Sequence, residues 1–317
     1  MATIPLFENP CVRDIAWACF GQNLINDFEA LGDTKGVQHC HITLTEARAQ
    51  WLQQLDQDPT LLLDHLSGLR SPRIGLYFEA LWQFFISQDP HLELLAHNLQ
   101  VSQNKKTYGE FDLIYRDSTT GRNYHLELAI KFYLNHSLSA NQGSFSADFH
   151  YWLGPNAIDR LDIKTEHLLN HQVQLSTSDA GKAALSLLGV DDVIQEIAIK
   201  GRLFYPYTIN PEPSPTALSS AHNYSHWLNF SNLKVNIQCC EEWLILDRSE
   251  WISPMYGEET QLKPRVKNQQ QLGTLLRAYF TNNTQPLIIS GLEKSNTHYQ
   301  EKLRFFITAD KWPEKAS

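Results

Sequence analysis

Hydrophobic and polar residues alternate along two short stretches in the first half of the chain, at residues 110–115 and 124–132. The segment between them, residues 117–122, reads Asp-Ser-Thr-Thr-Gly-Arg and is rich in turn-forming residues. Alternation with a period of two is typical of strands, because successive side chains point to opposite faces of a sheet. The pattern therefore predicts a β-hairpin. Its apolar face would carry Phe111, Leu113, Leu126, Leu128 and Ile130, and its other face Glu110, Asp112, Glu127, Ala129 and Lys131.

The polar face of this hairpin brings two acids together if the turn is a four-residue loop. Asp117 then pairs with Arg122, and counting back along both strands places Asp112 opposite Glu127. Cβ atoms of opposed residues lie about 4.5–5.5 Å apart, so two carboxylates there repel each other unless a proton or a cation lies between them. A hard ion such as Mg²⁺ is commonly held by one or two carboxylates and several waters. The hairpin predicts a metal site at this pair, and the alternative is a hairpin whose charged face is merely solvated.

The N-terminal 70 residues are predicted to be mainly helical. Apolar residues recur at helical spacing in residues 11–31 and again in residues 45–66. Between the two helices, His39, Cys40 and His41 follow one another, but the sequence offers no second ligand pair at zinc spacing nearby. A loop with solvent-facing histidines is therefore favoured over a zinc site.

A buried helix is predicted next, over residues 74–86, with Ser71 as N-cap and a proline after it. The helix is apolar on nearly every side, and Glu79 is its one acid. A buried carboxylate must be paired, protonated or bound to a metal. Glu79 is thus expected either to form a salt bridge with Arg70 or Arg73, or to join the metal site on the hairpin.

A row of polar side chains is predicted on a helix that follows the hairpin, with Asn156 as its N-cap. The row is the candidate substrate-binding surface, and its residues are Arg160, Lys164, His167, His171 and Gln172. Spacings of three and four residues place such side chains on one helix face, where they would bind phosphate groups. The alternative is a surface face whose cations pair with Asp159 and Glu166. Strands are predicted before the hairpin, at residues 92–101, and after this helix, at residues 193–207.

A domain boundary is predicted at residues 210–216, where three prolines in seven residues give a stiff extended linker. The chain then divides into a helical region, residues 1–70, a core, residues 71–210, and a C-terminal α+β region, residues 211–317. The last mixes strand patterns at residues 243–246, 287–290 and 303–307 with a helix at residues 269–280. It is the candidate surface for a protein partner.

Composition narrows the classes of function without choosing one. A formal net charge of −9 argues against a globally basic nucleic-acid coat protein, but it leaves room for a local basic groove. The five cysteines are odd in number, which favours free thiols over a disulfide framework. The N-terminus lacks a charged-then-apolar leader, and no window approaches the 18 or so apolar residues of a membrane span. We therefore expect a cytoplasmic protein with no membrane partner.

Four blocks taken in order carry a resemblance to a known superfamily: GLYFEALWQFF, GEFDLIYRD, HLELAIKFYL and GPNAIDRLDIK. With the predicted order helix, three strands, helix and strand, they resemble the PD-(D/E)XK, or restriction-endonuclease-like, nucleases over residues 71–207. They also resemble an uncharacterised bacterial domain-of-unknown-function family that has been grouped with these nucleases, and that likeness spans most of the chain. The resemblance implies an α/β (α+β) fold with a mixed sheet flanked by helices, preceded by the helical N-terminal region and followed by the α+β region.

The same resemblance implies roles for four residues. Asp112 would be the metal-binding aspartate, Glu127 the second acid and Glu79 the helical acid that completes a site for Mg or Mn. Lys131 would position the attacking water. The function so implied is a metal-dependent phosphodiesterase that acts on nucleic acid.

The spacing of the acid and the lysine departs from the pattern of these nucleases. Their Glu-x-Lys motif spans two residues, whereas Glu127 and Lys131 are four apart, about 13 Å along a strand. Either Ala129 occupies the usual glutamate position and Glu79 supplies the missing acid, or Glu127 is the ligand and Lys131 reaches back. In the predicted register Lys131 also lies diagonally across from Glu110. The third alternative is a degenerate site, in which the fold serves as a nucleic-acid- or protein-binding module.

Overall fold

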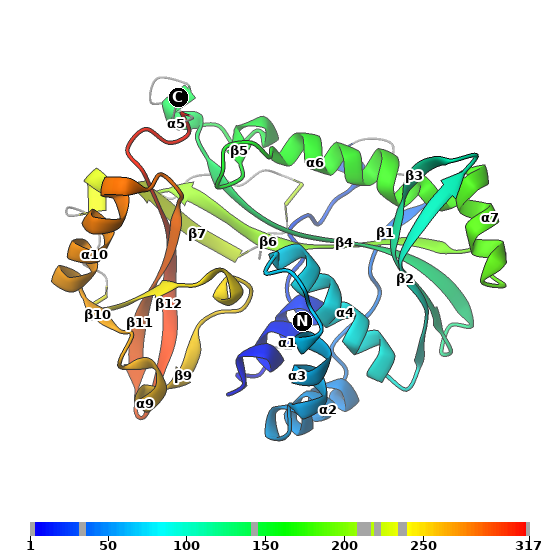
Figure 1. Ribbon diagram of the computed structural model, residues 1–317, viewed down its shortest axis with the longest axis horizontal. Helices are drawn as coiled ribbons and strands as arrows, with labels where there is room; N and C mark the ends of the chain where they lie inside the picture. The colour runs from blue at the N-terminus through cyan, green and yellow to red at the C-terminus, as the bar shows by residue number, and fades with distance from the viewer. Residues whose placement is uncertain are drawn as a thin grey trace.

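The computed structural model describes residues 4–31, 36–140, 145–207, 217–218, 223–233 and 240–314. At its centre is a mixed sheet of 12 strands with helices on both faces (Figure 1). The predicted α/β class, a mixed sheet flanked by helices, is therefore confirmed. Among the described residues, no helix combines the length and the apolar composition that crossing a membrane requires.

The predicted hairpin lies in the half of the sheet that the N-terminal two thirds of the chain build. Its strands, in spatial order, are β2 (Leu92–Gln103), β3 (Lys106–Asp117), β4 (Arg122–Asn135), β6 (Ile194–Pro206) and β7 (Asn223–Asn229). The first three form an antiparallel meander, whereas β6 is parallel to β4 and β7 is parallel to β6. The strands predicted before, within and after the hairpin are all present.

The C-terminal region extends this sheet beyond β7. In spatial order it adds β12 (His298–Thr308), β11 (Leu287–Ser295), β8 (Glu242–Leu246) and β10 (Lys267–Asn268). β12 is parallel to β7, and the remaining pairs are antiparallel. Short strands pair outside this path, namely β1 (Val37–His39) with β6, β5 (Trp152–Leu153) with β4, and β9 (Tyr256–Glu258) with β12.

Strand β6, which precedes the predicted boundary, and strand β7, which follows it, are neighbours in the same sheet. The proline-rich linker at residues 210–216 itself lies outside the described residues. Side chains also join the three predicted regions: Ser253 donates to the Asp14 carboxylate from its backbone N–H, at 3.1 Å, and from its hydroxyl, at 2.6 Å. The indole N–H of Trp227 donates to the carbonyl of Asn135 at 2.8 Å. The C-terminal region thus packs against both preceding regions.

Different helices cover the two faces of the half of the sheet that contains the hairpin (Figure 1). One face carries α1 (Pro10–Phe20), α2 (Glu46–Gln57), α3 (Thr60–Ser67) and α4 (Ile74–Gln88). The other carries α6 (Leu161–His167), which continues as a π-helical turn at Leu168–Gln172 and a 3₁₀ turn at Val173–Thr177, and then α7 (Asp179–Leu187). α5 (Ser137–Ala140) follows β4, and α9 (Glu259–Leu262) and α10 (Gln269–Asn282) belong to the C-terminal region.

Two predicted helix starts are wrong. Helix α4 begins at Ile74, so its N-cap is Arg73 and not Ser71. The Ser71 hydroxyl accepts from the N–H of Arg73, which lies outside the helix. The N-cap of α6 is Arg160 and not Asn156. Residues 154–159 instead form a turn in which Ala157 has a φ of 53°, a left-handed conformation that a right-handed helix cannot include.

The predicted loop with solvent-facing histidines is wrong. His39 ends strand β1 and is half-buried, and its Nε2 lies 3.0 Å from the carbonyl oxygen of Asn26. His41 turns inward, and its two ring nitrogens lie 2.8 Å from carboxylate oxygens of Asp117 and Glu196. The ring stacks on Tyr124, with centroids 4.4 Å apart. His41 therefore ties the segment after β1 to β3 and β6.

Strand β4 is buried on both faces, as a central strand between two helical layers must be. Its even-numbered apolar residues from Leu126 to Leu134 pack in one core with α1 and α4. Ala129 and Tyr133 pack in a second core beneath α6. Glu127 lies on this second face with 0% of its surface exposed. A charged side chain in such a position requires a specific set of partners.

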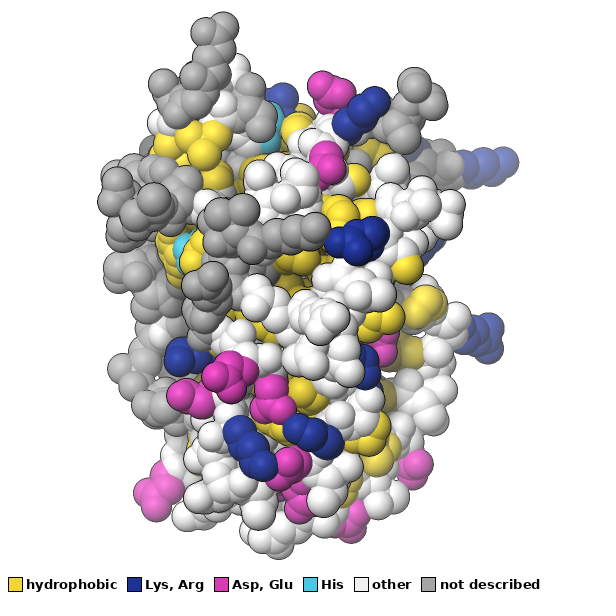
Figure 2. Space-filling view, turned by 90° about the vertical axis from the view of Figure 1, so that its left-hand side faces the viewer, with side chains coloured by type: hydrophobic (Ala, Val, Ile, Leu, Met, Phe, Trp, Pro, Cys, Tyr) yellow, Lys and Arg dark blue, Asp and Glu magenta, His cyan; other side chains and the backbone are white. Residues whose placement is uncertain are grey.

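The outer face of the C-terminal region carries charges of both signs. Figure 2 shows acids and bases interspersed over its lower part, where α9 and the β11–β12 hairpin lie. Several of these charges pair with one another, namely Lys263 with Glu242, Lys294 with Glu259 and Lys302 with Glu293. A protein partner for this region stays a prediction.

Candidate functional site

The candidate site is a fork where β3 and β4 separate. The ladder between them begins at Asp117–Arg122, as predicted, and ends at Leu113–Leu126. Beyond this pair β3 continues alongside β2, whereas β4 continues alongside β6. Asp112 and Glu127 come one position past the last ladder pair, so they flank the opening of the fork.

Asp112 occupies the position where the strands part. Its Oδ2 accepts a hydrogen bond from the backbone N–H of Leu128 at 2.8 Å, a donor that the neighbouring strand no longer satisfies. Burial raises the pKa of Asp112 to about 8, and the negative charge of Glu127 adds to this effect, followed by those of Glu79 and Glu110. After burial, the charge of Glu127 is thus the main reason for the raised pKa of Asp112.

Glu127 is held from two sides. The Nε2 of His125, which is also fully buried, lies 2.8 Å from its Oε1, and the amide of Gln172 donates to its Oε2 at 3.0 Å. Among the described residues, Nδ1 of His125 is buried without a hydrogen-bond partner. The proton of a neutral imidazole then belongs on Nε2, where it is donated to Glu127. Two of the roughly four lone-pair positions of the carboxylate remain for another ligand.

Glu79 approaches the fork from α4. Its Oε2 accepts from the side-chain amide of Asn98 at 3.1 Å, and the same amide lies 3.3 Å from Glu110. Burial raises the pKa of Glu79, and the charges of Glu110 and Glu127 raise it further. A salt bridge from Glu79 to Arg70 or Arg73 is absent among the described residues, so this helical acid lies with the other acids.

The row predicted to bind phosphate divides into two parts. Lys164 donates to the amide oxygen of Gln172 at 2.7 Å, and Nδ1 of His167 lies 3.1 Å from that oxygen. Burial lowers the pKa of Lys164, as does the nearby charge of Lys131, while Asp112, Asp159 and Glu127 oppose the change. Lys164 and Gln172 thus belong to the carboxylate cluster.

The rest of the row forms no hydrogen bond with these acids in the described part of the chain. Arg160 binds the carboxylate of Asp162 through two nitrogens, at 2.8 and 2.7 Å, so its charge is already paired. His171 is exposed, and its ring centroid is 5.4 Å from that of His167. The expected pairing of the row with Asp159 and Glu166 is wrong, because Asp162 takes this role for Arg160.

Lys131 has a partner that the sequence pattern did not indicate. Its Nζ donates to Oδ2 of Asp159 at 2.7 Å, and the hydroxyl of Tyr133 lies 3.3 Å from the same oxygen. The predicted diagonal contact with Glu110 is wrong, because the β3–β4 ladder ends before Glu110 could face Ala129. Lys131 therefore belongs to the edge of the neighbouring cleft.

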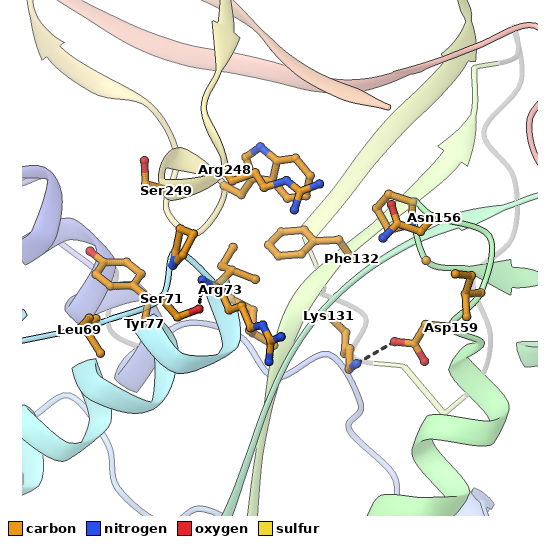
Figure 3. Close-up of a pocket in the computed structure, with 17 residues that line it drawn as sticks. Leu69, Ser71, Arg73, Tyr77, Lys131, Phe132, Asn156, Asp159, Arg248 and Ser249 are labelled. Atoms are coloured by element: carbon orange, nitrogen blue, oxygen red, sulfur yellow. Dashed lines mark hydrogen bonds and ion pairs between the residues drawn. The ribbon is translucent and has the colours of Figure 1, made fainter. Parts of the chain in front are cut away.

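A cleft of about 820 Å³ opens beside Lys131 (Figure 3). Its walls are the segment that leads into α4, the middle of β4, the turn at residues 154–159 and residues 248–251 of the C-terminal region. In Figure 3 the side chains of Arg73, Phe132 and Lys131 project into the space between these walls. Lys131 lines this cleft, the acids Glu79, Asp112 and Glu127 do not, and the C-terminal region closes it on one side.

The donor set at the fork suits a divalent ion that keeps most of its waters. No group of three or more His, Cys, Asp and Glu side chains is arranged to hold a metal together in the part of the chain that is described. Asp112 and Glu127 are nevertheless two carboxylates with free lone pairs and mutual repulsion, which is the protein contribution that Mg²⁺ usually requires. Glu79 would join through a water or after a change of rotamer.

Several residues of the site had no clear signal in the sequence. His125 is the exception, since it lies two positions before Glu127 on a strand and therefore on the same face. Asn98 has a φ of 46° and is held by Gln83 at 2.8 Å, and nothing in the local pattern indicates this. Asp159 lies in the turn at residues 154–159 and Arg248 begins a 3₁₀ turn at Arg248–Glu250, and the placement of both depends on tertiary packing.

Comparison with known proteins adds the family and no activity. No curated protein and no solved structure matches the chain. One family model matches residues 13–308, nearly the whole length. The chain therefore belongs to the family described as Domain of unknown function (DUF1853).

Proposed function

We propose that this protein is a metal-dependent phosphodiesterase that acts on nucleic acid, with its active site at the fork between β3 and β4. The observation that carries the proposal is the meeting of acids from three elements: Glu79 from α4, Asp112 from β3 and Glu127 from β4. Burial raises the pKa of Glu79 and of Asp112, and the charge of Glu127 raises both further. Such an arrangement costs stability, and it persists in proteins where function requires it.

The charge at the fork favours a cation. With a pKa of about 8, Asp112 holds a proton at neutral pH, which is how the site lowers its negative charge in the absence of metal. A divalent ion carries more positive charge than this proton and is expected to replace it. Mg²⁺ and Mn²⁺ are the ions that carboxylate and water ligands favour.

The residues around the acids would fix their geometry. His125 and Gln172 hold the two oxygens of Glu127, and Leu128 holds Asp112, so both carboxylates are oriented before a ligand arrives. When bound, the ion would polarise a phosphate and lower the pKa of a water molecule. The protein itself would orient these two acids and supply positive charge near them.

Two lysines are candidates for that positive charge. Lys131 lines the cleft and is bound to Asp159. Lys164 is coupled electrostatically to Asp112 and Glu127, and the amide of Gln172 links it to Glu127. We assign to Lys131 the binding of substrate charge at the edge of the cleft, and to Lys164 the stabilisation of charge at the acids.

The topology is consistent with the resemblance to nucleases. From α4 the chain runs through β2, β3 and β4, then through α6 and α7 to β6, which lies parallel to β4. This is the order of helix, three strands, helix and strand on which the resemblance rests.

Thermal unfolding in the presence of Mn²⁺ tests the proposal. The wild type should gain several degrees in Tm as Mn²⁺ is added, because a ligand that binds the folded state stabilises it. Asp112→Asn should remove this gain, whereas the exposed Asp191→Asn should keep it. Labelled single- and double-stranded DNA and RNA should be cleaved with Mg²⁺ or Mn²⁺ and left intact with EDTA. A wild type without a Mn²⁺ shift and without cleavage would refute the proposal.

A module that binds nucleic acid without cleaving it is the second candidate. Two observations favour it: the four-residue separation of Glu127 and Lys131, and the pairing of Lys131 with Asp159. Binding of nucleic acid that is indifferent to Mn²⁺, together with no cleavage, would select this candidate.

A further inference from the structure

We infer that the cleft beside Lys131 binds a single strand of nucleic acid, and that Arg248 of the C-terminal region is one of its phosphate-binding residues. The inference rests on the proposed function, since Lys131, to which that function assigns the binding of substrate charge, lines the cleft. It goes further by naming the form of the substrate and by giving the C-terminal region a part in binding it.

The cleft carries unpaired positive charge on opposite walls. Its charged lining residues are Arg73, Lys131, Asp159 and Arg248. Lys131 and Asp159 neutralise each other at 2.7 Å. Arg73 and Arg248 are exposed, and neither forms an ion pair with a carboxylate of the described residues. Two guanidinium groups without acidic partners therefore remain to bind an anion, and guanidinium is well suited to phosphate oxygens.

The same cleft offers apolar surface between these cations, lined by Ile74, Phe132 and Trp251 (Figure 3). The two aromatic rings pack edge to face, with centroids 5.6 Å apart, and present only the 6% and 8% of their surface that stays exposed. The guanidinium of Arg248 lies over the Trp251 ring, 5.9 Å from its centroid. Aromatic and apolar surface flanked by cations is how proteins hold an unpaired strand, with bases against the rings and phosphates on the cations.

The size of the cleft favours a single strand over a duplex as its ligand. A volume of about 820 Å³ is that of a pocket for a small ligand, in which a few nucleotides fit. Proteins meet duplex DNA differently, by placing an element in a groove, and stacked bases of a duplex cannot reach aromatic side chains in a pocket. Unpaired bases can enter.

The two arginines come from regions far apart in the sequence. Arg73 directly precedes α4, whereas Arg248 follows β8 in the C-terminal region. The hydrogen bonds between Ser253 and Asp14 fix this part of the C-terminal region against α1. The C-terminal region thus completes a cleft that the rest of the chain leaves open on one side.

Fluorescence anisotropy with labelled oligonucleotides, in EDTA, tests the inference without any metal chemistry. The probes are an unstructured 12-mer single strand, as DNA and as RNA, and a duplex of the same length. We expect the single strands to bind more tightly than the duplex. Arg248→Gln and Arg73→Gln should each weaken single-strand binding and reduce the slope of log K against log salt by about 0.7, the value for one phosphate contact with a single strand.

Matched variants guard against indirect effects. Arg277→Gln changes an exposed arginine on α10 outside the cleft and should bind like the wild type. Arg248→Lys keeps the charge and should recover much of the lost affinity. All variants should unfold near the wild-type Tm, because both cleft arginines are exposed.

The outcomes separate this inference from the proposed function. Unchanged single-strand binding by Arg248→Gln, or tighter binding of the duplex, would overturn the inference even if the wild type cleaves nucleic acid with Mn²⁺. Loss of binding by Arg248→Gln in a protein that never cleaves would support the inference and move the function to a binding module.

Discussion

The carboxylate of Asp112 accepts the backbone N–H of Leu128 at 2.8 Å, across the point where β3 leaves β4. A side chain here replaces a backbone carbonyl of the neighbouring strand, so the fork opens without an unsatisfied donor. The same contact places a second carboxylate beside the buried Glu127. The fork therefore gains a hydrogen bond and loses stability through charge repulsion.

Asp112→Asn is expected to stabilise the protein while removing metal binding. Asparagine can still accept from Leu128, but it carries no charge. The folded-state pKa of Asp112, about 8, exceeds its ordinary value. Between about pH 4 and pH 8 the folded protein therefore holds a proton that the unfolded chain has lost. The free energy of unfolding consequently falls as the pH rises through this range. At pH 8 the variant should be more stable by about 1–3 kcal/mol, measured by urea unfolding. The gain should vanish near pH 4, and a variant less stable than wild type at pH 8 would contradict the repulsion.

His125→Phe is expected to destabilise the protein and loosen Glu127. Phenylalanine fills much of the same buried space but cannot donate to the carboxylate at 2.8 Å. Loss of a hydrogen bond to a buried charge costs about 1.5–3 kcal/mol in urea unfolding. If Glu127 binds the metal, Mn²⁺ affinity should also fall by about 10–100-fold, as for other residues that orient a ligand. A Mn²⁺ affinity equal to that of wild type would show that Glu127 is not a ligand.

Lys131→Ala should remove turnover and leave metal binding nearly intact. The ion pair with Asp159 is partly exposed, so its loss should cost at most about 1 kcal/mol in stability. Asp159→Asn is the matched control, since it breaks the same pair, costs no more stability and leaves the lysine free. Turnover by Asp159→Asn with none by Lys131→Ala assigns the role to the lysine. Equal turnover by both variants would make the pair structural.

The stabilising effect of His41 should depend on pH. Both ring nitrogens lie 2.8 Å from carboxylate oxygens, and both can donate only when the ring is protonated. The hydrogen bond with Glu196 raises the pKa of His41, and burial opposes it only in part. Because the folded-state pKa is raised, the contribution is complete below the unfolded value of about 6.5 and is lost as pH rises through the folded value.

The comparison of wild type with His41→Asn measures this effect. The difference in Tm between the two proteins should be largest below pH 6.5 and should shrink toward pH 9. His41 and His91 line one pocket, and the His91 ring forms no ion pair in the described part of the chain. His91→Asn should therefore show no such trend. A difference in Tm that stays constant with pH would mean that His41 is neutral in the fold.

The sequence by itself determined the strands, the turn between them and the face to which most side chains of the hairpin point. These follow from alternation and turn composition, which are local properties, and so the pairing of Asp117 with Arg122 was predictable. The same count placed Asp112 opposite Glu127, whereas the ladder ends one pair before them. The placement of Phe111 was wrong: it packs with Ile114 and against the His125 ring, and not in the core that contains Leu113 and Leu126. That Glu79 is the one acid of a buried helix was also visible, although its choice between a salt bridge and the acids was not.

The tertiary structure alone decided where the strands part and what surrounds them. Beyond Leu113, β3 stays paired with β2, and beyond Leu126, β4 stays paired with β6. Where the two strands part therefore depends on β6, which lies far away in the sequence. Because the β3–β4 ladder ends there, the predicted register that placed Lys131 near Glu110 does not continue that far. A left-handed residue at Ala157 kept Asp159 out of the helix and brought it to Lys131. Arg248 reaches the cleft because the C-terminal strands extend the same sheet, and long-range pairing of that kind leaves no mark on the local pattern of polar and apolar residues.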